Sequence, residues 1–456
     1  MREARRSTDP WQQHADAIRA LRASYAAIPA GSPVRLAKRT SNLFRPRAAV
    51  GAGLDVSGLA GVLEVDPVTR TAQVQGMCTY EDLVDATLAH GLVPTVVPQL
   101  RTITLGGAVT GLGIESTSFR HGLPHEAVLE MDVLTGAGEV VTVRPGDDLF
   151  EAFPNSYGSL GYATRLVVAL LPAPGHVELE HVRIDDRGLL ARTVAAIVET
   201  GELDGERVDG LDGVVFAPDE AYLTVARWRE GPAERPSDYT GREIFYRSVQ
   251  QRPRDVLTTH AYLWRWDTDW FWCSGALGLH RPWVRRVWPR RWRRSDVYHR
   301  LVALDTRWGL VDRLDRRAGR PRRERVVQDV EVPVERLPEF LDWFDEHVGM
   351  TPVWICPLVA RKDWPTYPLE PGRTYVNVGF WGTVHVGEDA PLGPVNRAVE
   401  EHVHALGGHK SLYSEAFYDR ETFDRLYDGA RLAAVKAVHD PHDRLTSLYD
   451  KVVRRQ

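Results

Sequence analysis

The sequence predicts an α+β protein, and three observations support this class. Two segments are typical of β-hairpins: GVLEVD and TAQVQG on either side of Pro67, and AVLEMDVLTGAGEVVTVRP with its turn at 136–138. Helical periodicity is confined to separate stretches such as 11–29. The glycine motif at 50–58 (VGAGLDVSG) does not complete the GxGxxG of a parallel dinucleotide-binding unit, because Val56 stands where the third glycine is needed.

The bulk composition is that of a globular protein. Its 456 residues can build two or more domains, and 43% hydrophobic against 26% charged residues is ordinary for that class. A net charge of −5 argues against a nucleic-acid partner. The cysteines, Cys78, Cys273 and Cys356, show no CxxC spacing, so neither disulfides nor a metal site is expected. Because no apolar signal or spanning stretch is visible, we expect a cytoplasmic protein, with peripheral membrane association left open.

The first unit, 1–175, combines the two hairpins with short helices. After the helix of 11–29, Thr79 and Asp82 match a capping box that opens a helix through Ala89. Residues 91–122 are rich in glycine and threonine with little periodicity and are expected to form a loop. DDLFEAFPN predicts a short helix and TRLVVALLPA a buried strand.

The second unit, 176–425, has strands that alternate with helices. A helix is predicted around LLARTVAAIVET, and RVVQDVEVPVERLPEFLDWFDEHV is typical of a strand, a cap and a helix. PVWICPLVA and TYVNVGFWG are predicted strands, and 394–406 and 419–437 are predicted helices. We expect the last segment, 426–456, to return to the first unit.

Two glycine-rich segments are the strongest functional signal. TITLGGAVTGLGIESTSFRHGL covers 102–123, and SYGSLGYAT precedes the buried strand. Glycines let backbone N–H groups approach a ligand closely and form anion-binding nests, and hydroxyls add donors to a pyrophosphate. The two segments could therefore close on one extended cofactor. The alternative is that these glycines only form turns.

The segment TLGGAVTGLGIESTSFRHGL resembles the flavin-contacting segment of the vanillyl-alcohol oxidase/p-cresol methylhydroxylase (PCMH-type) FAD superfamily. Within it, GLGIESTSFRHGL is similar to the flavin-dependent sterol side-chain reductases. GVLEVDPVTRTAQVQG, DDLFEAFPNSYGSLGYATRLVVALLPA, VVQDVEVPVERL, PVWICPL and LYSEAFYDRETFDRLYDG also resemble that subgroup, in the same order. Bacterial relatives in the subgroup reduce methylene-branched fatty acyl chains of phospholipids.

The resemblance implies an FAD-binding domain over 1–175, covered by a cap domain with an antiparallel sheet flanked by helices over 176–425. It assigns FAD contacts to three segments, the first being KRTSNLF at 38–44, where Lys38 is a further candidate. The implied cofactor-binding residues are Arg39, Thr40, Ser41, Asn42, Thr104, Leu105, Gly106, Gly107, Thr110, Gly111, Gly113, Ile114, Glu115, Ser116, Ser118, Gly158, Ser159, Gly161 and Thr164.

The sequence departs from the family pattern in two places. Many oxidases of the superfamily tether FAD through a histidine in the first loop, but no histidine lies between His14 and His90. His121 lies in the second segment, where the sterol-reductase group lacks a tether. We therefore expect noncovalent FAD. Animal sterol reductases also carry an N-terminal membrane helix, and no counterpart is visible here.

The resemblance implies reduction of a lipid carbon–carbon double bond by hydride from flavin N5, with NADPH as the electron source. An unpolarised double bond needs a positioned acid. Glu415 and Tyr413 in LYSEAFYD are the first candidates, and Asp329 is the second; the alternative is that the acids are ordinary salt-bridge partners. The other functions considered are an alcohol or sugar oxidase or dehydrogenase and a non-catalytic flavin-binding scaffold.

A tryptophan- and arginine-rich segment covers 262–294, with seven of the chain's fourteen tryptophans and seven arginines from 281 to 294. Tryptophan favours the membrane interface and arginine favours anionic headgroups, so we expect peripheral membrane contact here. A protein interface has the same composition and is the alternative. A lipid methyltransferase acting one step earlier is a further expected partner.

Overall fold

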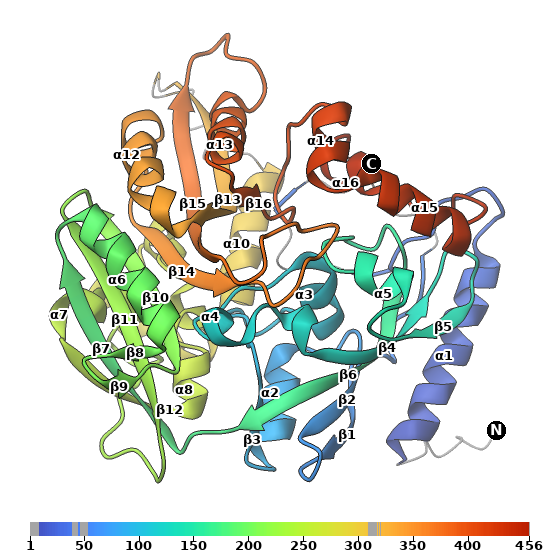
Figure 1. Ribbon diagram of the computed structural model, residues 1–456, viewed down its shortest axis with the longest axis horizontal. Coiled ribbons are helices and arrows are strands. Elements are labelled where there is room, and N and C mark those ends of the chain that lie inside the picture. Colours follow the sequence, from blue (N-terminus) through green and yellow to red (C-terminus); the bar gives the residue numbers. More distant parts are fainter. Residues whose placement is uncertain are drawn as a thin grey trace.

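Two antiparallel β-sheets organise the molecule (Figure 1). The computed structural model describes residues 9–38, 44–45, 53–308, 317, 319 and 321–455. Every pair of named strands in it is antiparallel, which confirms the α+β class and differs from the parallel sheet that a GxGxxG unit at 50–58 would need. Of the predicted loop residues, Arg39, Thr40, Ser41 and Asn42 lie outside the described residues.

The first sheet has the strand order β1-β2-β6-β4-β5, and β3 also pairs with β6. Its strands are β1 (Val62–Asp66), β2 (Thr71–Gln75), β3 (Leu92–Pro94), β4 (Val128–Leu134), β5 (Val140–Val143) and β6 (Tyr162–Pro172). Both predicted hairpins are confirmed, because β1 pairs with β2 and β4 with β5. The predicted buried strand is β6, which has neighbours on both sides and thereby holds the N-terminal unit together.

The helices of this unit are α1 (Pro10–Ala27), α2 (Tyr80–Leu88), α3 (Leu105–Gly111), α4 (Ser118–His121) and α5 (Asp148–Ala152), with the 3-10 turn η1 (Pro124–Ala127). The predicted cap of α2 is confirmed, because the Thr79 hydroxyl accepts the Asp82 backbone N–H at 3.2 Å. The prediction that 91–122 is all loop is wrong, since β3, α3 and α4 lie within it. Thr104 caps α3 by accepting from the Gly107 N–H, a local signal stronger than the glycines that follow it.

The second sheet has eight strands in the order β12-β7-β11-β10-β14-β15-β13-β16. Its strands are β7 (His176–Ile184), β10 (Gly210–Ala217), β11 (Glu220–Arg229), β12 (Arg254–Thr258), β13 (Arg322–Pro333), β14 (Val353–Val359), β15 (Thr374–Val386) and β16 (His409–Lys410), and β8 (Glu202–Leu203) and β9 (Glu206–Arg207) form a separate hairpin. Its helices and 3-10 turns are α6 (Arg187–Thr200), α7 (Phe245–Gln251), α8 (Thr259–Leu263), η2 (Asp267–Asp269), η3 (Cys273–Leu277), α9 (Pro282–Val287), η4 (Arg290–Trp292), α10 (Ser295–Trp308), η5 (Val334–Arg336), α12 (Leu337–His347) and α13 (Pro394–Ala405). The apolar sides of α6, α12 and α13 close one core with this sheet.

The C-terminal helices are α14 (Arg420–Leu426), α15 (Gly429–His439) and α16 (Leu448–Val452). The single helix predicted over 419–437 is therefore wrong. Asp428 breaks it with a left-handed backbone (φ 44°) and caps α15 by accepting from the Arg431 N–H. An ion pair of 2.8 Å between Arg431 and Asp148 ties α15 to α5, so this end of the chain lies against the N-terminal unit.

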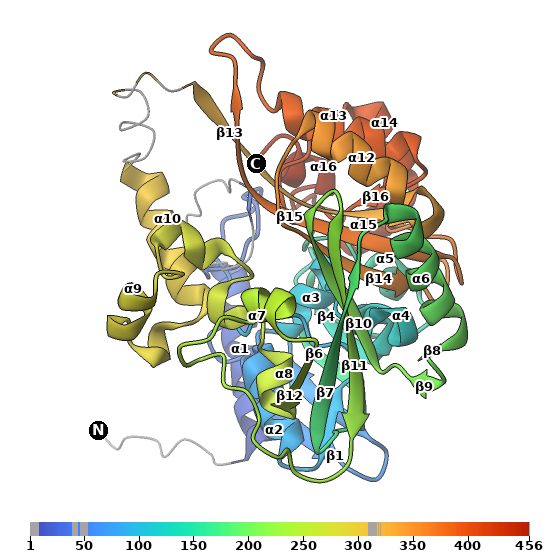
Figure 2. The same cartoon turned by 90° about the vertical axis from the view of Figure 1, so that its left-hand side faces the viewer.

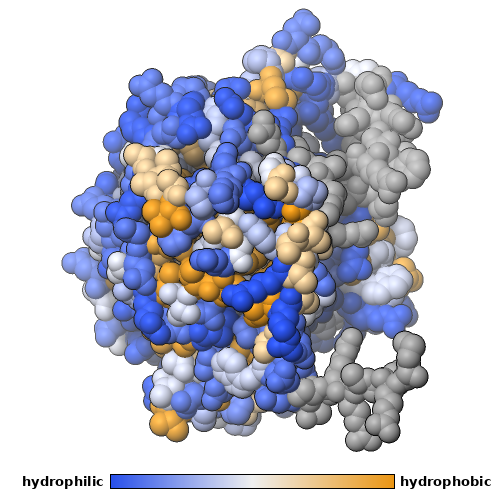
Figure 3. Space-filling model, turned by 90° about the vertical axis from the view of Figure 1, so that its right-hand side faces the viewer, coloured by the Kyte–Doolittle hydropathy of each residue, from blue (hydrophilic) through white to orange (hydrophobic). Residues whose placement is uncertain are grey.

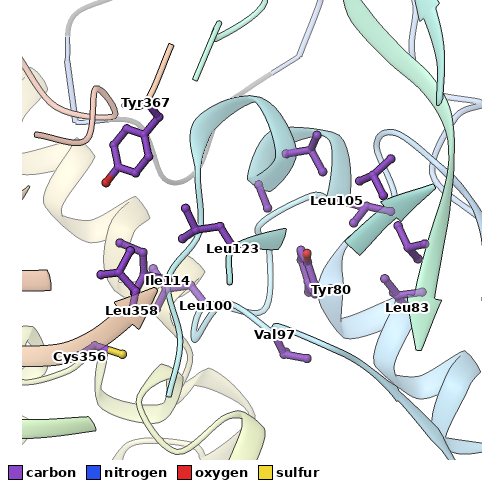
Figure 4. Packing of buried hydrophobic residues seen from close by; sticks show 14 of the residues in the cluster. Tyr80, Leu83, Val97, Leu100, Leu105, Ile114, Leu123, Cys356, Leu358 and Tyr367 are labelled. Carbon is purple, nitrogen blue, oxygen red and sulfur yellow. The ribbon is translucent and has the colours of Figure 1, made fainter. Parts of the chain in front are cut away.

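The two units share a buried interior. Leu100, Ile114 and Leu123 of the N-terminal unit pack in one cluster with Leu358 and Tyr367 of the second (Figure 4). On the face formed by α1 and the C-terminal helices, hydrophobic residues gather in the middle, with hydrophilic residues around them (Figure 3). None of the helices in the described part of the chain has the length and hydropathy of a membrane span.

Candidate flavin site

One cavity of about 380 Å³ lies where the N-terminal unit meets the second sheet and the C-terminal helices. Both glycine-rich segments line it. The predicted residues in its wall are Thr104, Gly106, Gly107, Thr110, Gly111, Gly113, Ile114, Gly158, Gly161, Asp329 and Tyr413. Residues up to 309 positions apart in the sequence, Thr104 and Tyr413, thus face one space, and both glycine-rich segments line a common volume.

The glycines allow close backbone packing along this wall. A Cβ on Gly106 would lie 2.6 Å from the Gly76 carbonyl oxygen, so no side chain fits between α3 and the end of β2. Gly158 and Gly161 adopt φ of +73° and +145°, which L side chains rarely adopt. The Tyr157 ring lies beside Gly111, and its hydroxyl donates to the Gly111 carbonyl at 2.7 Å. These glycines therefore shape the wall that a flat ligand would lie against.

Basic side chains converge on the same cavity from two distant parts of the chain. Arg35, Lys38 and Arg45 come from the N-terminal region, and Lys451 comes from α16. The Lys451 ammonium donates to the Gly158 carbonyl at 2.7 Å, which fixes it beside the second glycine segment. Such a cluster suits the diphosphate of a dinucleotide, since each cation neutralises part of its charge.

An unsatisfied donor also points to a ligand. The side-chain amide nitrogen of Gln99 is buried in the cavity wall and has no hydrogen-bond partner in the described structure. Leaving such a group unpaired costs about 1–3 kcal/mol, and a polar ligand would remove that cost. With the glycine wall and the cations, the residues present fit FAD.

Seven predicted residues do not line the cavity. Leu105 is buried in the core, the Thr164 hydroxyl donates to the Asp132 carbonyl, and the Ser159 hydroxyl is buried without a partner among the described residues. The Ser116 and Tyr262 hydroxyls share a hydrogen bond, and the Ser118 hydroxyl accepts from the Glu115 N–H. Glu115 pairs with Arg265, and Glu415 pairs with Arg455 at 2.6 Å. These side chains support the wall or lie outside it.

Glu115 belongs to a buried charge cluster that connects the flavin segment to the second sheet. The Arg265 guanidinium lies 3.0 Å from the Glu115 carboxylate and 2.9 Å from that of Asp212, and all three side chains are buried. Burial raises the pKa of Glu115 even though Arg265 opposes the shift. Breaking one member would leave an uncompensated buried charge, so the cluster fixes the wall relative to the sheet.

A strained aromatic turn forms another wall. Trp270 and Phe271 have φ of 47° and 59°, which is uncommon for bulky residues and costs about 1–3 kcal/mol each. Buried carboxylates hold the turn: Asp267 accepts the Ser295 hydroxyl at 2.5 Å, and Asp269 pairs with Arg285 at 2.6 Å. The strained turn places the Trp270 and Phe271 rings in the cavity wall.

Further aromatic rings make this part of the cavity apolar. Phe271 lies 4.4 Å from Trp381 and 5.5 Å from Trp354, centroid to centroid, and Phe44 stacks on Trp270 at 5.9 Å. All five line the cavity. The cavity thus has a glycine- and cation-lined part that suits a dinucleotide and an aromatic part that suits an apolar chain.

Asp329 is the carboxyl group that faces this aromatic part. It lies on β13, accepts the Asn377 amide at 3.2 Å and accepts the Tyr413 hydroxyl. Tyr413 in turn accepts the Trp381 indole N–H at 2.9 Å. Desolvation raises the pKa of Asp329 to about 6, against the opposing hydrogen bonds. A carboxyl with such a pKa can hold and release a proton near neutrality.

A second buried acid stands two residues along the same strand. The Glu331 carboxyl is fully buried and accepts the Ser411 hydroxyl at 3.2 Å. Desolvation raises its pKa well above the ordinary value, and the nearby Asp329 raises it further. The neutral form of Glu331 is therefore favoured, which keeps a second negative charge away from Asp329.

Several residues of the site were not predicted, and only some had a signal. Glu331 lies two residues from the predicted Asp329, so the alternation of β13 places both on one face, a pattern visible in VVQDVEV. Gln99, Trp354 and Lys451 gave no such signal, since their approach depends on packing between units. Among the described residues, no group of three or more histidine, cysteine, aspartate or glutamate side chains is placed to hold a metal ion.

Known proteins with similar sequences include sterol reductases and a cytokinin dehydrogenase. A family model described as "FAD binding domain" matches residues 12–144. The Delta(24)-sterol reductase homolog dhcr-24 of Caenorhabditis elegans is 23% identical over 431 residues, 87% of this chain and 78% of that protein. The Delta(24)-sterol reductase of Homo sapiens is 23% identical over 418 residues, 87% of this chain and 77% of its own. Cytokinin dehydrogenase 2 of Oryza sativa subsp. japonica is 38% identical over 119 residues, 26% of this chain and 21% of its own.

Proposed function

We propose that this chain, an FAD-dependent oxidoreductase with a PCMH-type FAD-binding domain, reduces a carbon–carbon double bond in a lipid. The substrate would be a methylene-branched fatty acyl chain or a sterol side chain. The observation that carries the proposal is a protonatable carboxyl, Asp329, facing an aromatic-lined part of the flavin cavity. The relatives named Delta(24)-sterol reductase support it, because the similarity extends far beyond the matched FAD binding domain.

The chain's own residues prepare the site. When bound and reduced, FAD supplies hydride. The residues that would hold it are Gly106, Gly107, Gly111 and Gly158 in the wall, with the cations at the diphosphate. The described lining contains no histidine that could tether the cofactor, so we propose that FAD is bound noncovalently. We also propose NADPH as the electron donor.

Proton delivery is the task of Asp329. An isolated double bond has no carbonyl to polarise it, so protonation of one carbon must accompany hydride arrival at the other. The aromatic rings exclude water and raise the pKa of the Asp329 carboxyl, which favours its protonated form. Tyr413, bonded to both Asp329 and Trp381, holds the carboxyl in place as a positioning residue.

The experiment follows electrons and product together. Purified holoprotein is reduced anaerobically with NADPH, and the flavin absorbance is followed after adding phospholipid that carries a methylene-branched acyl chain, or desmosterol. We expect reoxidation of the flavin and a mass increase of two hydrogens in the lipid. Asp329→Asn should retain yellow FAD and bleach with NADPH but reoxidise at least about tenfold more slowly.

The alternative activity has its own readout. Cytokinin dehydrogenase 2 aligns with only 26% of the chain, so it supports the cofactor rather than the substrate. If lipids left the reduced flavin unchanged while alcohols or sugars bleached the oxidised flavin, the reductase proposal would be overturned in favour of a dehydrogenase or oxidase. Asp329→Asn with undiminished lipid reduction would overturn the assignment of the acid.

A further inference from the structure

We propose that α9 and the turn after it, residues 281–292, form a docking patch for an anionic lipid surface. The use of the patch rests on the proposed function, because a lipid-reducing enzyme must take its substrate from a membrane. The binding itself can be measured without any reaction.

Most of the tryptophan- and arginine-rich segment is turned inward. Trp264 and Trp266 are buried, and Arg265 belongs to the charge cluster with Glu115. Arg285 is also buried; it pairs with Asp269 and donates to the Tyr239 carbonyl at 2.9 Å. The exposed part of 262–294 is therefore smaller than its composition suggests, and only that part can contact a partner.

The outward-facing part carries large hydrophobic side chains. Trp283 is 67% exposed, Val287 75% and Trp292 45%. These are three of the nine large hydrophobics exposed in the described chain, and they fall within ten residues. The helix α9 lies at the edge of the molecule, on the side away from α6 (Figure 2), so nothing in the described fold covers it.

The charge around these side chains is positive. Four exposed arginines flank them: Arg281, Arg286, Arg290 and Arg291. No aspartate or glutamate occurs from Trp270 to Ser295. One acid, Asp238, lies close enough to pair with Arg290, at 3.1 Å. The patch thus combines tryptophan with a surplus of arginine over acidic residues, as an anionic membrane interface requires, within a chain whose net charge is −5.

The patch is also fixed in shape and connected to the site. Arg285 and Arg293 point inward. Arg285 donates to the Gly241 carbonyl and Arg293 to the Trp288 carbonyl, and these hydrogen bonds fix α9 and the turn after it on the fold. The tryptophan- and arginine-rich segment of 262–294, to which the patch belongs, also contributes Trp270 and Phe271 to the cavity wall. A membrane bound at 281–292 would therefore lie on the segment that also bounds the apolar part of the cavity, and this continuity favours lipid over a protein partner.

The test uses holoprotein and vesicles that contain no substrate double bond. Sedimentation with vesicles of saturated phosphatidylcholine, with and without phosphatidylglycerol, measures the partition. One variant removes the hydrophobic contacts (Trp283→Ala, Val287→Ser, Trp292→Ala) and another the charges (Arg286→Ala, Arg290→Ala, Arg291→Ala). Matched controls change exposed residues elsewhere: Val68→Ser with Val438→Ser, and Arg19→Ala with Arg192→Ala and Arg254→Ala.

We expect wild-type protein to bind phosphatidylglycerol vesicles and to lose binding as salt rises. Each arginine removed should weaken partition about fivefold, and the controls should bind like wild type. Absent binding by wild type, equal binding by patch and control variants, or a wild-type oligomer that the hydrophobic variant dissociates would each overturn the proposal. Retained flavin absorbance shows that a variant is folded. Because no lipid is reduced in this assay, a failure here leaves the reductase proposal standing.

Discussion

Replacing Asp329 by asparagine should stabilise the protein at neutral and alkaline pH while removing the proposed proton donor. Burial raises the pKa of this carboxyl from 3.8 to about 6. Two pKa units at about 1.36 kcal/mol each correspond to about 3 kcal/mol of unfavourable free energy once the group is ionised. Asparagine cannot ionise and keeps an amide in the same position.

The sign of the pH dependence follows from proton binding. Between the unfolded pKa and about 6, the folded state holds more protons than the unfolded state, so its stability falls as pH rises through this window. At pH values well below the unfolded pKa of 3.8, both states hold the proton and the cost is absent. The advantage of Asp329→Asn should therefore grow from about pH 4 to about pH 7 and then level off.

Urea unfolding of wild type and Asp329→Asn across this pH range, at one FAD concentration, measures the difference. Asp389→Asn, a change at an exposed aspartate, serves as the control and should show no such growth. If the difference in unfolding free energy between wild type and Asp329→Asn were the same at about pH 4 and about pH 8, the carboxyl would not be desolvated. Asp329 would then be an ordinary ionised carboxylate and could not supply the proton near neutral pH.

Three further changes test other parts of the site. Gly111→Leu should lower the FAD content of the purified protein, measured as flavin absorbance per chain, because even a Cβ there would lie 3.2 Å from the Tyr157 ring. Tyr413→Phe should lower kcat for lipid reduction about ten- to a hundredfold and shift the alkaline limb of the pH–rate profile, a shift that a purely structural role would not produce. Arg265→Met should cost about 3–5 kcal/mol in urea unfolding, because it leaves two buried carboxylates without their cation, and an unchanged midpoint would refute the charge cluster.

Local signals predicted the N-terminal unit well. The hairpin turn at 136–138 and the cap at Thr79 depend on a few neighbouring residues, and both are confirmed. The prediction of a PCMH-type FAD domain is also confirmed, by the match over 12–144. The prediction failed where a weak local signal competed with a stronger one, as at Thr104 and at Asp428, which splits one expected helix into two.

The cavity shows where sequence reasoning ends. Among the predicted acids, the structure brings Asp329 to the cavity and pairs Glu415 with Arg455 outside its wall. Each is an acidic residue with a polar residue before it and an apolar residue after it, so their immediate neighbours do not distinguish them. The difference arises because β13 crosses the cavity, whereas Glu415 lies where the chain already turns toward α14. Trp264 and Trp283 show the same limit. Both lie in the tryptophan- and arginine-rich segment, but Trp264 is buried and Trp283 is exposed.

By itself, the sequence determined the α+β class, the two hairpins and the glycine-rich segments of a flavin protein, because periodicity, turns and caps act over a few residues. Tertiary structure alone decided which acid, which aromatic rings and which cations share one space. Those contacts join residues as far apart as Arg35 and Lys451. Their free energy comes from burial and charge pairing between units, and no short stretch of sequence contains that information.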